Sequence, residues 1–139
     1  MKKTVIWILL SVIGLIVILI FFYRWFVMRV NSDFATEALL EYHYSNKDIS
    51  IVITDEDNMQ TLKEILKGIP HMDYPSCGFS NNVSITMTNG NKRIVFCPAN
   101  DTCPLLRINS SDRYIDITED DKIRLYGVLE KYGMTFPCI

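Results

Sequence analysis

Residues 4–23 read TVIWILLSVIGLIVILIFFY, twenty consecutive residues without a charged side chain. At a rise of about 1.5 Å per residue, a helix of this length extends roughly 30 Å, which matches the hydrocarbon core of a bilayer. Because every backbone amide in hydrocarbon needs an internal hydrogen-bond partner, a single spanning segment has to be helical. The stretch predicts a transmembrane helix, with the lipid bilayer as its partner.

A cleavable signal peptide is the main alternative interpretation of this stretch. Such a peptide has an apolar core of about 7–15 residues followed by small residues at a cleavage site. The run here is longer, residues 21–28 (FFYRWFVM) contain no A-x-A-like site, and residues 33–35 (DFA) are a poor substitute. We therefore expect an uncleaved anchor in residues 1–30, with the helix continuing past the bilayer surface to about Asn31.

The charges that flank the anchor leave its orientation nearly undecided. Lys2 and Lys3 precede the run, and Arg24 and Arg29 follow it, so the positive-inside counts almost balance. The leading tail has three residues, and the rest of the chain carries all four cysteines, which persist as disulfides in an oxidising compartment. We expect a cytoplasmic N-terminus and an extracytoplasmic domain at a cell membrane, and the richness in Ile, Lys and Asn suggests a bacterial source.

Residues 31–139 are long enough for one small domain with its own core. They carry sixteen acidic and ten basic residues, a net charge of −6. Nucleic acid requires a basic surface, so this composition argues against nucleic acid as a partner.

The first half of this domain predicts two strands and a helix. Residues 34–44 fit either a weakly amphipathic helix or a strand, and apolar residues at 40, 42 and 44 favour a strand for the second half. Residues 49–53 (ISIVI) form a strand, and residues 54–57 (TDED) then open a helix because carboxylates cap free N–H groups. Its apolar face lies at residues 59, 62, 65 and 66, and Gly68 and Pro70 end it. Residues 69–82 form a long loop.

The second half predicts four further strands and a second helix. Asn89-Gly90 is a strong hairpin signal, and a turn centred on that pair sets Ile85 opposite Ile94 and Val83 opposite Phe96. Strands at residues 105–108 and 114–117 follow, and residues 118–121 (TEDD) cap a helix that runs to about Tyr132. The predicted fold is α+β, with an antiparallel sheet of about five or six strands and two amphipathic helices on one face.

The four cysteines, Cys77, Cys97, Cys103 and Cys138, are disulfide candidates. Four cysteines allow three pairings. We favour Cys97–Cys103, which closes a short loop, together with Cys77–Cys138, which ties down the terminus. The next choice is Cys77–Cys97 with Cys103–Cys138.

Two other chemical roles for the cysteines are weaker. A Cys₄ zinc site would need a reducing cytoplasm, and its ligands usually come in pairs spaced C-x₂₋₄-C, whereas the nearest pair here is C-x₅-C. A thiol enzyme would use Cys77 with His71 and Asp73, which are close in sequence but are not forced together. The acidic clusters at residues 55–57 and 119–121 lack the D-x-D-x-D-G pattern of calcium loops. We therefore expect no cofactor, no metal and no catalytic residue.

Tyr42, Tyr44, Tyr74 and Phe79 could form an exposed aromatic surface for a partner, although such residues are more often core or strand surface. The sequence thus predicts a membrane-anchored, non-catalytic binding domain whose partner is a protein of the cell envelope. An inhibitor, an immunity protein or an accessory protein would fit this description.

Overall fold

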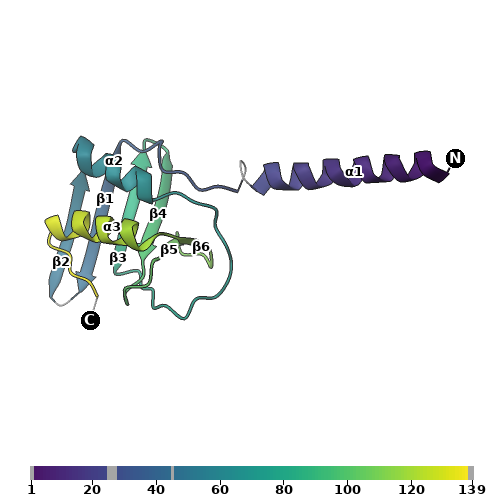
Figure 1. Ribbon diagram of the computed structural model, residues 1–139. Coiled ribbons are helices and arrows are strands. Elements are labelled where there is room, and N and C mark those ends of the chain that lie inside the picture. Colours follow the sequence, from purple (N-terminus) through teal and green to yellow (C-terminus); the bar gives the residue numbers. More distant parts are fainter. Residues whose placement is uncertain (1, 25–27, 45, 138–139) are drawn as a thin grey trace.

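The computed structural model describes residues 2–24, 28–44 and 46–137. Its elements are α1 (Lys2–Phe22), β1 (Glu37–Tyr44), β2 (Lys47–Ile53), α2 (Glu56–Ile65), β3 (Val83–Asn89), β4 (Lys92–Pro98), β5 (Leu105–Ile108), β6 (Tyr114–Asp116) and α3 (Glu119–Lys131). The fold is α+β, with an N-terminal apolar helix and a six-stranded antiparallel sheet (Figure 1). This confirms the fold class and the order of elements expected from the sequence.

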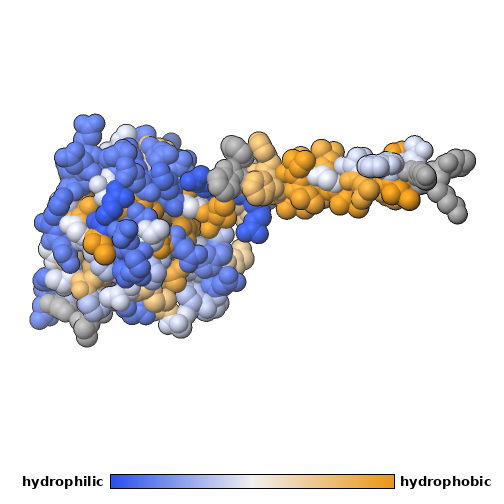
Figure 2. Space-filling model, in the orientation of Figure 1, coloured by the Kyte–Doolittle hydropathy of each residue, from blue (hydrophilic) through white to orange (hydrophobic). Residues whose placement is uncertain are grey.

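Helix α1 is long and apolar enough over Thr4–Phe22 to cross a membrane. None of this stretch is buried against the rest of the chain, and its surface is predominantly apolar, whereas the visible face of the domain is largely hydrophilic (Figure 2). A signal sequence near the N-terminus would have the same length and composition.

Residues 29–31 approach the domain outside any helix. Val30 forms an isolated antiparallel bridge with Gly68, in which Val30 N donates to Gly68 O at 2.8 Å and Gly68 N donates to Val30 O at 3.0 Å. The expectation that the helix continues to Asn31 is therefore wrong for residues 28–31, because Val30 uses its backbone groups to pair with the domain.

The strands lie in the order β2-β1-β3-β4-β5-β6. Residues 37–44 form a full strand, which confirms the strand interpretation and extends it toward the N-terminus. Helix α2 connects β2 to β3 across β1. One row of cross-strand neighbours spans five strands and faces the helices: Ile51, Leu40, Ile85, Phe96 and Ile108. Burial of such rows is the main stabilising term of a sheet domain.

The hairpin between β3 and β4 closes one residue later than expected. Asn89 pairs with Lys92, so the central turn residues are Gly90 and Asn91. Gly90 has φ +57°, which fits the glycine required at the first central position of a type II′ turn. The expected pairs Ile85/Ile94 and Val83/Phe96 are therefore wrong, and Ile85 lies opposite Phe96. Moving the turn by one residue changes the cross-strand partner of each residue by two positions. Because this change is an even number, the same side chains still face the core.

Both α2 and α3 pack on one face of the sheet (Figure 1). Asp55 caps α2 by accepting from Asn58 N at 3.0 Å, and Thr118 caps α3 by accepting from Asp121 N at 3.0 Å. The cap predicted in residues 54–57 is thus confirmed at Asp55, whereas at α3 the capping side chain is Thr118 and the acidic residues 119–121 lie in the first turn. The two helices bury six side chains in the core: Met59, Leu62, Ile65, Leu125, Val128 and Leu129.

Candidate functional site

The four aromatic residues predicted as a partner surface have different environments. Tyr42 is 1% exposed, and its hydroxyl lies 3.0 Å from Thr135 O. Tyr44 and Phe79 are half-buried, while Tyr74 is 81% exposed. The prediction is therefore wrong for Tyr42, because β1 is a central strand and residue 42 points toward the helices.

Phe79 and Tyr44 hold the loop of residues 69–82 against the domain. The Phe79 ring packs on the Tyr114 ring with centroids 5.3 Å apart, and the Tyr44 hydroxyl lies 2.6 Å from Ser80 Oγ. Arg107 donates from Nη2 to Asn81 Oδ1 at 2.6 Å. These aromatic residues thus attach a loop to the sheet.

The cysteine pairing differs from both preferred predictions. Cys77 is bonded to Cys103, and Cys97 is a free, buried thiol. Cys97 belongs to β4, where its position opposite Arg107 in β5 keeps it within the sheet, while Cys103 lies in the following turn. The turn meets the 69–82 loop instead, as Asn100 N donates to Gly78 O at 2.8 Å. Cys138 lies outside the described residues.

The disulfide is a structural link between two loops. Asp101 supports it by accepting from Gly78 N at 3.0 Å and from Cys103 N at 3.4 Å. A bridge across 26 residues of sequence contributes about 3 kcal/mol in the chain-entropy account. Cys77, Asp101 and Cys103 are close enough to share a metal ion, but two sulfurs bonded to each other offer no thiolate ligands. The described residues thus do not assemble a Cys₄ site.

The alternative thiol site is only partly assembled. His71 Nδ1 lies 3.6 Å from Asp73 Oδ2, and His71 Nε2 lies 3.4 Å from Asp116 Oδ2. Cys77 is in the disulfide and therefore has no thiolate with which to attack a substrate. His71 also pairs through its backbone with Tyr114, with N···O distances of 2.9 and 3.0 Å, so it helps to fix the loop to β6.

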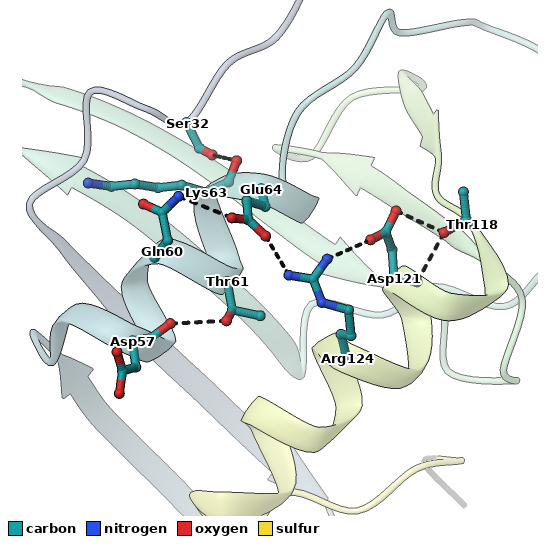
Figure 3. A network of polar contacts seen from close by, with 9 residues as sticks. All are labelled: Ser32, Asp57, Gln60, Thr61, Lys63, Glu64, Thr118, Asp121 and Arg124. Atoms are coloured by element: carbon teal, nitrogen blue, oxygen red, sulfur yellow. Dashed lines mark hydrogen bonds and ion pairs between the residues drawn. The ribbon is translucent and has the colours of Figure 1, made fainter.

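A polar network joins α2 to α3 (Figure 3). Arg124 donates to Glu64 Oε2 at 2.5 Å and to Asp121 Oδ1 at 3.2 Å, and Gln60 donates to Glu64 Oε1 at 3.1 Å. The hydrogen bond from Arg124, with a smaller one from Gln60, lowers the pKa of Glu64. Because each group is paired with another on the same two helices, the network orients the helices relative to each other.

The second contact between the helices involves Tyr132 of the α3 C-cap. Its hydroxyl donates to Asp55 Oδ2 at 2.8 Å and accepts from Asn58 Nδ2 at 3.0 Å. The backbone hydrogen bond from Asn58, followed by the bond from Tyr132, lowers the pKa of Asp55. Desolvation, followed by the bond to Asp55, raises the pKa of Tyr132. Both networks are structural in this arrangement.

The sheet face opposite the helices is a better candidate for a binding surface than the aromatic residues, the cysteines or the interhelical networks. The 69–82 loop covers the β5–β6 end of this face through the Phe79–Tyr114 packing. At the other end Val52 is 54% exposed. We call the solvent-facing residues of β1, β2, β3 and the first part of β4 the open face.

A shallow groove of about 210 Å³ crosses the open face. It is lined by Glu37, Leu39, Val52, Thr86, Thr88 and Arg93. The aliphatic side chains Leu39 and Val52 are direct cross-strand neighbours. At one end of the groove Glu37 and Arg93 flank Thr88 from the two adjacent strands. The groove therefore combines an apolar floor with charges of both signs.

The open face is bounded by an exposed sheet edge. Strand β2 is the outer strand on that side and has seven residues. The opposite edge strand, β6, has three residues and is bridged by His71. An outer strand presents unpaired backbone N–H and C=O groups that can accept another strand. The edge and the groove together form one continuous candidate surface.

The groove was not predicted from the sequence. Leu39 and Val52 lie on the faces of their strands that otherwise carry the polar residues Glu37, Glu41 and Ser50. An apolar residue at such a position is the signal that could have identified the site, but recognising the pair required knowledge of the β1–β2 register. In comparisons with models of protein families, with curated proteins and with solved structures, no match to the chain was found.

Proposed function

We propose that this chain is a single-pass, membrane-anchored binding protein of the cell envelope, with a cytoplasmic N-terminus and a non-catalytic extracytoplasmic domain. Helix α1 has the length and composition of a membrane span. The Cys77–Cys103 disulfide is compatible with an oxidising compartment. Both features support a domain held at the outer surface of the membrane.

The observation that carries the binding role is the half-covered sheet. The helices cover one face, while the opposite face keeps Val52 exposed beside Leu39 in the groove. Exposed aliphatic side chains surrounded by polar groups are typical of protein-binding surfaces. The open face is therefore the proposed binding surface.

The charge and shape of this surface indicate an extended protein segment as the occupant. The face carries the carboxylates of Glu37 and Asp48, both exposed, and that of Glu41, which is half-buried. The domain as a whole has a net charge of −6, which favours a basic partner. An extended segment could also pair with the edge of β2 and so gain backbone hydrogen bonds.

The test is site-specific photo-crosslinking of the full chain in the membrane of its source cells. A photoreactive amino acid at Val52 should give a discrete adduct with one protein, and Val52→Glu should abolish capture by a second probe at Leu39. The matched control is Ile123 on α3, which is 65% exposed but lies on the helical layer. A probe at Ile123 should give no adduct, and Ile123→Glu should leave capture at Leu39 intact. Equal capture at both positions, or none at Val52, would contradict the proposal.

A further inference from the structure

A second concave site lies where the chain leaves the apolar helix. It has a volume of about 370 Å³ and is lined by Arg24, Met28, Ile69, Pro70, His71, Met72, Asp73 and Arg113. This volume falls within the roughly 300–1,000 Å³ of small-molecule sites. The lining comes from three separate segments, namely the end of the anchor, the 69–82 loop and the turn between β5 and β6.

The position of Arg24 relates this cavity to the membrane. The apolar stretch of α1 ends at Phe22, two residues before Arg24. Arginine side chains just beyond the end of a membrane span extend to the headgroup level. If Thr4–Phe22 spans the bilayer, as proposed above, the cavity opens at the height of the lipid headgroups.

The charges of the cavity favour an anion. The carboxylates of Asp73 and Asp116 lie 3.6 and 3.4 Å from the His71 ring. Among the ion pairs of the described residues, neither the Arg24 nor the Arg113 guanidinium has a partner. Two arginines without carboxylate partners can bind a phosphate oxygen, the geometry for which guanidinium is best suited.

The loop beside the cavity carries exposed apolar groups on an anchored backbone. Met72 is 71% exposed and Tyr74 is 81% exposed. The His71–Tyr114 bridge precedes these residues and the Cys77–Cys103 disulfide follows them. An apolar methionine and an amphipathic tyrosine presented in this way suit the interfacial layer of a bilayer.

We infer that this cavity binds the phosphate of an anionic phospholipid through Arg24 and Arg113, while Met72 and Tyr74 insert into the interface. The inference rests on the proposed membrane span, but not on the partner that binds the open face. Its consequence is that the lipid fixes the orientation of the domain on the bilayer. The open face then stays directed toward its partner.

The test uses the full chain in nanodiscs of phosphatidylcholine with increasing phosphatidylglycerol, and follows hydrogen–deuterium exchange of residues 69–74. Protection should rise with the mole fraction of phosphatidylglycerol. Arg113→Gln or Arg24→Gln should each raise the mole fraction for half-maximal protection about fivefold, as expected for the loss of one basic residue near an anionic surface. Arg93→Gln, the same change on the open face, should have no effect, and neither should Val52→Glu.

Three results would overturn the inference. They are protection independent of phosphatidylglycerol, the same protection produced by soluble glycerol phosphate in phosphatidylcholine discs, or an equal effect of Arg93→Gln. Failure of the chain to copurify with the discs would instead overturn the membrane span itself. The Arg24→Gln variant leaves the domain unchanged, so a folding defect in Arg113→Gln cannot explain the outcome.

Discussion

Among the glycines of the chain, Gly68 leaves the least room for a side chain. A Cβ atom at this position would lie 2.4 Å from Ile115 Cγ2. Ile115 is 1% exposed, so it has little room to move. Gly68 also exchanges backbone hydrogen bonds with Val30. The absence of a side chain at Gly68 therefore allows this pairing to lie directly against Ile115.

Replacing Gly68 by alanine should destabilise the domain by about 1–3 kcal/mol, the usual cost of overpacking a core. Chemical denaturation of the full chain in detergent, followed by circular dichroism, measures this change. Gly127→Ala is the matched control. Nothing lies within 4 Å of a Cβ at Gly127 in the interior of α3, so this change should stabilise by about 0.5–1 kcal/mol. Two changes of the same sign would contradict the packing argument.

At the scale of elements, α2 and α3 are joined by hydrogen-bonded carboxylates. Glu64 and Asp55 both have pKa values below their ordinary ones. A carboxyl whose folded pKa lies below its unfolded pKa stabilises the fold above the unfolded value, and this contribution is lost as the pH falls through the folded value. Both groups are well exposed, so each contribution is modest.

We therefore expect the free energy of unfolding to fall as the pH drops below about 4.5, the ordinary value for Glu. Urea unfolding at a series of pH values measures this slope. In the double variant Glu64→Gln with Asp55→Asn, the dependence of the free energy of unfolding on pH should be shallower, because these two side chains no longer take up protons on unfolding. Glu130→Gln is the control, since this exposed carboxylate has no ion pair among those of the described residues. An unchanged slope in the double variant would refute the linkage.

The elements themselves were predictable, but their relative placement was less so. The caps at Asp55 and Thr118 made both domain helices predictable, because capping depends on residues that are close in sequence. The hairpin register was wrong because Asn89-Gly90 and Gly90-Asn91 are both acceptable turn pairs, and the choice is made by the neighbouring strands. The loop that passes Cys77 meets Cys103, a contact that depends on tertiary structure.

The candidate site was harder to predict than the fold. Leu39 and Val52 form one apolar patch only after β1 and β2 pair in register. Arg24 and Arg113 are 89 residues apart in the chain and line the same cavity. Sites of this kind arise from the topology, so a pattern within one segment cannot reveal them.

At the scale of the whole molecule, an apolar helix is followed by a domain whose loops are linked by a disulfide. Helix α1 is long and apolar enough to supply the proposed membrane attachment, and the Cys77–Cys103 bond links the 69–82 loop to the turn after β4. The bond persists in an oxidising compartment. The proposed topology and the disulfide therefore have to be observed together in the same cells.

The most direct test is thiol alkylation of intact cells before and after reduction, combined with external protease and peptide mass mapping. We predict that Cys77 and Cys103 are recovered as one linked peptide and are alkylated only after reduction. The buried Cys97 should react only after unfolding, and protease added outside the cytoplasmic membrane should degrade the domain. Reduced thiols at Cys77 and Cys103 in a domain that is protected from external protease would contradict the account.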